Sequence, residues 1–163
     1  MEESLKHTDP FLLNGAVLAY VGDAVYELMV RQYVLDLGAR QADKLHKHSI
    51  RLVNAAAQSD MIRALMTELT ETEAGIFKRG RNASTLTAAR NQSITDYRRA
   101  TGLEALFGYL YLNGEKERLR ELFSHGVRIL EAEEAQAQNP PEHKAQESNE
   151  GADALSESPG FVK

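Results

Sequence analysis

Apolar residues in the first 132 positions recur mainly at intervals of three and four, which predicts a chain of α-helices. The first helix is predicted over residues 14–37, with Gly38 as its stop. No alternating pattern typical of a strand and no internal repeat is present, so we predict an all-α fold. The stripe of the first helix consists of Leu18, Val21, Val25 and Leu28, continued by the polar Gln32 and widened by Met29.

Two further helical regions are predicted before residue 80. An Ala-rich region covers residues 41–69, with a bend near Gln58-Ser59. The segment from Thr70 to Glu73 has the capping-box pattern that begins a new helix, which we predict to end around Gly80. The apolar side of the Ala-rich region consists of Leu45, Ile50, Val53, Ala57, Met61, Ile62 and Leu65.

The polar stretch 79–93 predicts an exposed loop because it is full of loop-forming residues. Helices over 94–112 and 115–131 follow, and Asn113-Gly114 forms the stop between them. The predicted inward residues are Leu103, Leu106, Phe107 and Leu110 in the first of these helices, and Leu119, Leu122, Phe123, Val127 and Ile129 or Leu130 in the second.

The distribution of charge divides the chain into a domain and a tail. Residues 133–163 hold seven acidic and two basic residues and few sizeable apolar side chains. Such a segment cannot offset the entropy lost on ordering. We therefore predict one helical domain over 1–132 and a disordered acidic tail over 133–163. The tail accounts for the net charge of −5, and the basic residues of the balanced domain concentrate in 78–99.

The bulk composition favours a soluble cytoplasmic protein. The chain has no cysteine, so disulfide bonds and thiolate chemistry are excluded, as suits a reducing compartment. The first six residues are acidic where a secretory signal would be basic and then apolar. No apolar run approaches the length of a membrane span.

Two carboxylates have the surroundings of a candidate site. Asp23 projects away from the predicted stripe and follows Gly22, and Glu104 has Gly108 one turn later. A glycine inside a helix costs about 1 kcal/mol relative to alanine, and the close approach of another helix or a ligand is one reason to keep it. If the two helices cross here, Asp23 and Glu104 could jointly hold Mg²⁺. On spacing alone, two solvated acids are the simpler interpretation.

His46 and His48 form a weaker candidate metal pair. Side chains two residues apart on a helix point about 200° apart, so the two imidazoles cannot share an ion unaided. We interpret them as solvated surface histidines.

The sequence around the two carboxylates resembles the motifs of a known family. The segment LAYVGDAVYE, from Leu18 to Glu27, is similar to the signature helix of ribonuclease III catalytic domains, whose aspartate maps onto Asp23. The segment TGLEALFGYLYL, from Thr101 to Leu112, resembles the second motif, whose metal-binding glutamate maps onto Glu104. The segment FKRGRNA over 77–83 and the absence of a double-stranded-RNA-binding domain resemble the Mini-ribonuclease III group.

This resemblance covers about residues 10–131 and implies a homodimeric helical bundle that cuts double-stranded RNA. It implies Mg²⁺, or Mn²⁺ in its place, held by Asp23 and Glu104 as the catalytic residues, and products with 5′-phosphate ends. It further implies a large-subunit (23S) ribosomal RNA precursor as substrate and the ribosomal large subunit as a partner. The residues expected to contact RNA are Lys78, Arg79, Arg81 and Asn82, for which an ordinary solvated basic loop is the other interpretation.

Departures from the classical enzymes leave alternatives open. Those enzymes carry two further acids where this chain has Ala16 and Ala19, and an aspartate where it has Thr101. Mini-ribonuclease III proteins are reduced in the same way, so the number of metal ions per site stays open. One alternative is a non-catalytic RNA-binding or ribosome-assembly module with the same fold. Another is a helical protein-interaction module that acts through its acidic tail.

Overall fold

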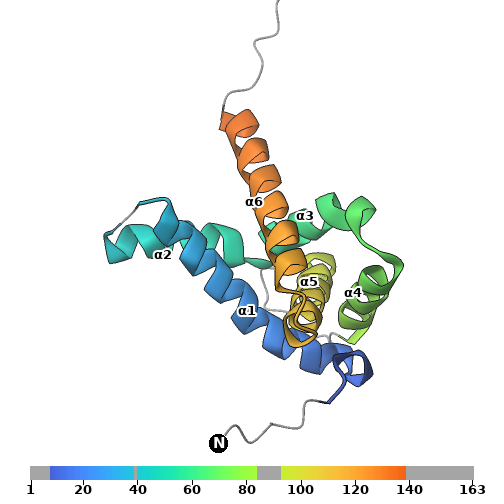
Figure 1. Cartoon of the computed structure of the whole chain (residues 1–163). Helices are drawn as coiled ribbons and strands as arrows, with labels where there is room; N and C mark the ends of the chain where they lie inside the picture. Colours follow the sequence, from blue (N-terminus) through green and yellow to red (C-terminus); the bar gives the residue numbers. More distant parts are fainter. Residues whose placement is uncertain (1–7, 39, 84–92, 139–163) are drawn as a thin grey trace, which may run out of the picture.

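The computed structural model describes residues 8–38, 40–83 and 93–138, and within them it consists of helices without a strand (Figure 1). The all-α prediction is confirmed. The elements are the 3-10 turn η1 (Pro10–Leu12), α1 (Gly15–Asp36), α2 (Ala42–Val53), α3 (Ala55–Leu65), the 3-10 turn η2 (Met66–Glu68), α4 (Glu71–Ala83), α5 (Ile94–Leu112) and α6 (Lys116–Gln138).

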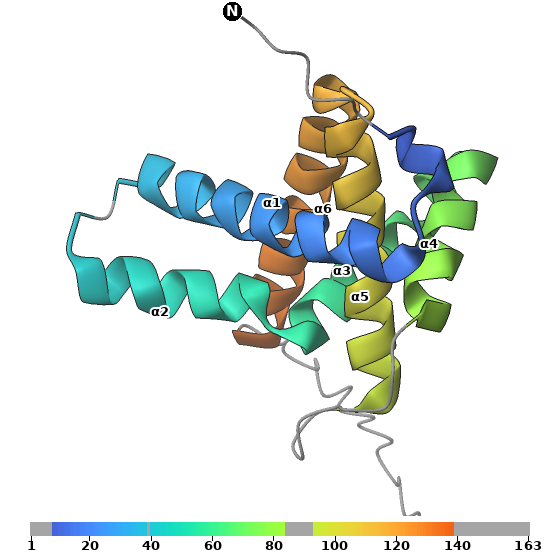
Figure 2. The ribbon, with the colours of Figure 1, turned by 90° about the horizontal axis from the view of Figure 1, so that it is seen from below.

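Helix α5 is the centre of the bundle and packs against α1, α3, α4 and α6. Its central part is buried on nearly every side, from Gly102 to Leu110, with only Glu104 partly exposed. Helices α1 and α2 run side by side, and their joined ends project from the bundle as an arm (Figure 2). None of the helices in the described ranges is long and apolar enough to cross a membrane.

The buried face of α1 differs from the predicted stripe. The buried residues repeat every four positions through Leu18, Gly22, Tyr26 and Val30, whereas Leu28 of the predicted stripe is 65 % exposed. The prediction is confirmed for Leu18 and wrong for Leu28. It followed the apolar side chains, whereas α1 meets α5 at Gly22, which has no side chain. The apolar residues left beside that face form a groove, described below.

The Ala-rich region is two helices that break at Asn54, not a single helix bent near Gln58-Ser59. The Asn54 side chain accepts a hydrogen bond from the Ala57 N–H at 2.9 Å and so begins α3. Its amide group also donates to the carbonyls of Ile50 and Arg51 at the end of α2, at 3.1 and 3.0 Å. One side chain therefore ends one helix and caps the next.

The predicted capping box at the start of α4 is confirmed. The Glu73 N–H donates to the Thr70 hydroxyl at 3.2 Å, and the Thr70 N–H donates to the Glu73 carboxylate at 2.8 Å. Glu73 is buried and also pairs with Arg118 of α6 at 2.8 Å. Burial acts to raise the pKa of Glu73, but hydrogen bonds from Arg118 and Thr70 outweigh it and hold the pKa below its ordinary value.

Helix α4 continues through Gly80 to Ala83, so the predicted loop begins too early in the sequence. A Cβ at Gly80 would lie 2.4 Å from the Cβ of Ala105 in α5, and this close packing holds the glycine inside the helix. The RNA-contact candidates at 78–82 therefore lie on the last turns of a helix. The rest of the predicted loop, residues 84–92, lies outside the described residues.

The last two helices follow the sequence prediction closely. Helix α5 has the predicted bounds, and Gly114, with a φ of 76°, ends the turn that follows it. Helix α6 extends to Gln138, past the predicted end at 131. Two contacts hold this last part of the helix: Glu131 accepts a hydrogen bond from the Tyr33 hydroxyl, and Glu134 pairs with Arg51. The remaining part of the predicted tail, residues 139–163, lies outside the described residues, and its disorder stays a prediction.

Candidate active site

Helices α1 and α5 touch backbone to backbone at two glycines. A Cβ at Gly22 would lie 1.6 Å from the carbonyl oxygen of Glu104, and a Cβ at Gly108 would lie 2.0 Å from that of Leu18. No other residue type leaves room for this crossing. The close helix approach that the glycines predicted is therefore present, and it brings Asp23, the residue after Gly22, to Glu104.

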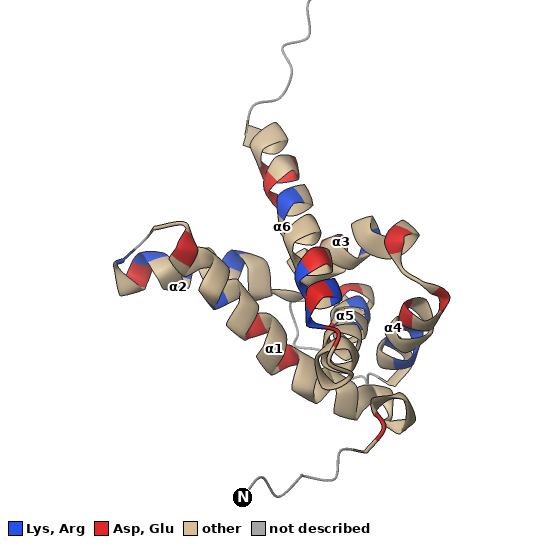
Figure 3. Ribbon diagram, viewed as in Figure 1, with Lys and Arg blue, Asp and Glu red and all other residues tan. Residues whose placement is uncertain are grey.

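The two carboxylates interact electrostatically. Asp23 is exposed, while Glu104 is partly buried between the helices. Burial and the negative charge of Asp23 raise the pKa of Glu104 to about 8, and a hydrogen bond with the Gln58 side chain acts in the opposite direction. Partial burial and the charge of Glu27, one turn later on α1, raise the pKa of Asp23. The site therefore gathers acidic side chains beside the crossing of α1 and α5, and Figure 3 shows acidic positions along α1.

Gln58 is a member of the site that the sequence prediction missed. It is 3 % exposed in α3, in a stretch otherwise dominated by alanine and large apolar residues. A buried polar side chain needs a hydrogen-bond partner, and Glu104 is that partner. The sequence does show an amide side chain within an apolar helical stretch, which could have indicated a buried polar contact. The sequence analysis instead interprets Gln58-Ser59 as a bend.

Tyr26 connects the site to the arm. Its ring is fully buried, and its hydroxyl donates to the Leu52 carbonyl at the end of α2 at 2.9 Å. Burial and the charge of Glu104 raise its pKa above the ordinary value, so the hydroxyl stays neutral and remains a donor. Tyr26 thus fixes α1 against α2 directly behind the carboxylates.

The carboxylate pair suits a hydrated divalent cation. The described residues contain no group of three or more His, Cys, Asp or Glu that could hold a metal ion. His46 and His48 therefore belong to no such group. Two mutually repelling carboxylates nevertheless offer the hard oxygen ligands that Mg²⁺ prefers, and Mg²⁺ commonly keeps several of its waters. Thr101, in place of a family aspartate, donates its hydroxyl to the Tyr97 carbonyl of its own helix at 3.0 Å.

The candidate RNA contacts divide into two groups. The Arg79 guanidinium donates to the carbonyls of Phe11 and Leu13, at 2.8 and 3.2 Å, and so fastens the N-terminal turn. Lys78 is exposed. Arg81 and Asn82 line a pocket together with residues at the start of α5. The structure therefore brings Arg81 and Asn82 together and directs Arg79 elsewhere.

The raised pKa of Glu104 predicts a pH-dependent stability in metal-free buffer. Because the folded state holds this proton up to about pH 8, folding stability should fall as pH rises from near 4.5 toward 8. We expect Glu104→Gln to melt roughly 3–6 °C above the unaltered chain at pH 8.5, with a smaller gap at pH 6. Thermal unfolding followed by circular dichroism with EDTA measures this. An equal or lower melting temperature for Glu104→Gln at pH 8.5 would contradict it.

Comparison with known proteins places this geometry in a family. Residues 16–115 match the model of the ribonuclease III domain. The chain is 45 % identical over 125 residues to the Mini-ribonuclease 3 of Brevibacillus brevis, covering 77 % of this chain and 93 % of the relative. It is 48 % identical over 120 residues to that of Clostridium tetani, covering 73 % and 80 %.

A solved structure has a similar fold. The crystal structure of a Fusobacterium nucleatum protein matches with a TM-score of 0.65 at 32 % identity, covering 72 % of this chain and 93 % of the other. The family match includes both helices that carry the carboxylate pair. The chain belongs to the ribonuclease III family, among the Mini-ribonuclease 3 proteins, and is an endoribonuclease of the ribonuclease III type.

Proposed function

We propose that this endoribonuclease cuts double-stranded RNA as a homodimer and uses Mg²⁺, or Mn²⁺ in its place, at Asp23 and Glu104. The observation that carries the proposal is the carboxylate pair at the glycine crossing of α1 and α5. A divalent cation would offset both the burial and the repulsion by Asp23 that raise the pKa of Glu104. Precursor ribosomal RNA of the large subunit is the proposed substrate, since its paired ends would present a duplex.

The residues of the site have separate tasks in this proposal. When bound, the cation supplies an activated water and stabilises the negative charge that develops on the phosphate. Asp23, on the exposed side, holds the cation where RNA can reach it, and Glu104 holds it from the partly buried side. Gln58 fixes the Glu104 carboxylate by its hydrogen bond. The glycine crossing fixes the separation of the two helix backbones that carry the carboxylates.

The direct test compares two RNAs under the same conditions. A perfect RNA duplex and one of its strands alone are incubated with the unaltered protein in Mg²⁺ and in EDTA. We expect cleavage of the duplex in Mg²⁺ only, with 5′-phosphate ends, and little cleavage of the single strand. Equal cleavage of both RNAs would refute the duplex preference, and undiminished cleavage in EDTA would refute the metal. A duplex that is bound but left intact would favour the non-catalytic module.

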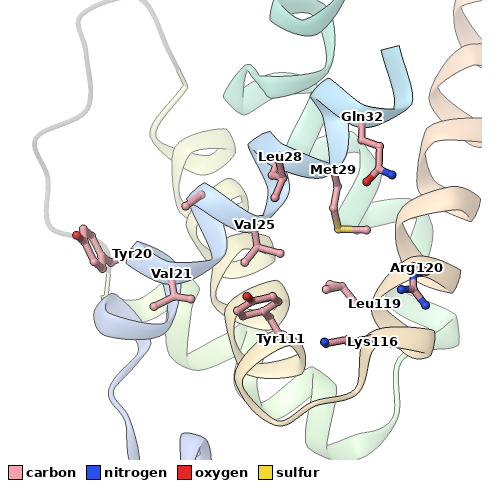
Figure 4. Close-up of a pocket in the computed structure, with 11 residues that line it drawn as sticks. Tyr20, Val21, Val25, Leu28, Met29, Gln32, Tyr111, Lys116, Leu119 and Arg120 are labelled. Carbon is pink, nitrogen blue, oxygen red and sulfur yellow. The ribbon is translucent and has the colours of Figure 1, made fainter. Parts of the chain in front are cut away.

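The proposed homodimer has a candidate interface on α1. A groove of about 690 Å³ is lined by several residues of the predicted apolar stripe of the first helix, among them Val21, Val25 and Leu28, and by Tyr20 and Tyr111 (Figure 4). Tyr20 is 82 % exposed, Leu28 65 % and Tyr111 48 %, an unusual concentration of apolar surface. A two-fold pair would cover this face on both chains with the same residues, and its symmetry would match that of a duplex. Lys116 and Arg120 form the polar rim of the groove.

A charge placed in the groove should separate the dimer. We expect Leu28→Arg to give a monomer at micromolar concentration, because dimerisation would bury an unpaired guanidinium. Size-exclusion chromatography with light scattering measures the mass. Leu12→Arg is the matched control, since Leu12 is 74 % exposed but lies outside the groove. The interface would be misplaced if Leu28→Arg and Leu12→Arg had the same dimeric mass.

A further inference from the structure

The last turn of α4 and the first turns of α5 enclose a polar pocket of about 540 Å³. Figure 3 shows Lys and Arg positions on both helices. Arg81 and Asn82 come from α4, and the other three residues come from α5. The lining residues are Arg81, Asn82, Thr95, Arg98 and Arg99.

Within the described residues, the three arginines of this pocket have no carboxylate partner, in contrast to five other arginines of the chain. Arg98 and Arg99 form no ion pair or side-chain hydrogen bond with the described residues. Among the same residues, Arg81 donates one side-chain hydrogen bond, to the Asn82 amide oxygen at 3.3 Å, and its guanidinium lies 5.8 Å from the centre of the Phe77 ring. Arginines that pair with acids elsewhere are Arg31, Arg51, Arg63, Arg118 and Arg120.

The spacing of the pocket is fixed by close packing of the two helices. A Cβ at Gly80 of α4 would lie 2.4 Å from the Ala105 Cβ and 2.9 Å from the Thr101 carbonyl oxygen. A Cβ at Gly102 of α5 would lie 2.5 Å from the Phe77 ring. Three like charges held this close repel one another unless an anion lies between them. The pocket also lies at the N-terminal end of α5, where the helix dipole adds to the attraction for an anion. Arginine guanidinium groups bind phosphate through strong, often bidentate hydrogen bonds, and the asparagine amide and threonine hydroxyl can donate further ones.

We propose that this pocket holds one backbone phosphate of the RNA substrate, distinct from the phosphate that is cut. This inference rests on the proposed function. Arg98 and Arg99 precede Glu104 on the same helix by about 8–9 Å along the axis and point roughly 120–140° away from it. They therefore position the RNA by a contact to its backbone and take no part in the chemistry. Such contacts contribute to affinity and to its dependence on salt.

The test measures binding and cleavage separately for Arg98→Gln/Arg99→Gln. The control is Arg63→Gln/Arg128→Gln, which removes the same charge from exposed positions on α3 and α6. Binding of a fluorescent RNA duplex is titrated at several salt concentrations in the Asp23→Asn background, so that no cleavage occurs. Steady-state cleavage is measured with the same double variants in which Asp23 is unaltered. Circular dichroism checks that both double variants fold.

We expect the pocket variant to bind roughly 10-fold more weakly than the control variant, with a salt slope smaller by about 1 to 2. KM should rise while kcat stays near that of the unaltered chain. Equal affinity and equal salt slopes in the two double variants would overturn the inference while leaving the proposed function intact. If the unaltered chain itself neither binds nor cuts the duplex, the proposed function fails, and this inference fails with it.

Discussion

We expect Asp23→Asn and Glu104→Gln each to lower the rate of RNA duplex cleavage in Mg²⁺ by roughly 10³-fold or more. Each substitution removes one of the two carboxylates that meet at the crossing of α1 and α5. In the proposed mechanism these carboxylates would hold the cation, so losing one charge would weaken the stabilisation of the developing phosphate charge by several kcal/mol. Single-turnover cleavage at saturating protein measures the chemical step without a contribution from binding.

Two comparisons decide whether this loss comes from the chemistry. Asp60→Asn removes an exposed carboxylate on α3 that pairs with Arg63, and it should leave cleavage unchanged. Glu104→Gln should be folded and more stable than the unaltered chain at high pH, so unfolding cannot explain its inactivity. Cleavage by Asp23→Asn at more than a tenth of the normal rate would remove Asp23 from the catalytic centre.

Gly22→Ala should destabilise the protein by more than about 3 kcal/mol, which is at the upper end for overpacking of a core. The added methyl group would lie 1.6 Å from the Glu104 carbonyl oxygen, a backbone atom that cannot turn aside. The two helices have to separate, and α5 then loses packing along its most extensive contact. Urea unfolding measured at 25 °C gives the difference in the free energy of unfolding.

Gly75→Ala is the matched control, because Gly75 also lies inside a helix but has nothing within 4 Å of an added Cβ. Alanine has the higher helix propensity, so this variant should be more stable by about 1 kcal/mol. Gly108→Ala, with its Cβ 2.0 Å from the Leu18 carbonyl oxygen, should behave like Gly22→Ala. Equal unfolding free energies for Gly22→Ala and Gly75→Ala would mean that α1 and α5 do not touch as described.

Local patterns were sufficient where a helix is set by its own sequence. The bounds of α5, the capping box of Thr70 and Glu73, and the stop at Asn113-Gly114 depend on hydrogen bonds within a few residues. The apolar faces of α5 and α6 were also predictable, because large side chains dominate them. Asp23 and Glu104 were identified through their motifs and the glycines beside them, although their roles in catalysis and metal binding stay predictions.

Contacts between helices decided the rest. The sequence by itself determined a helical chain with two carboxylates beside glycines, because periodicity, caps and motifs are local. Only the tertiary structure decided that α1 is buried along Gly22 and Tyr26, that Arg79 turns to Phe11 and Leu13 while Arg81 joins Arg98 and Arg99, and that Gln58 bonds to Glu104. These features depend on which backbones approach each other, and a glycine that permits close approach contributes nothing to an apolar pattern.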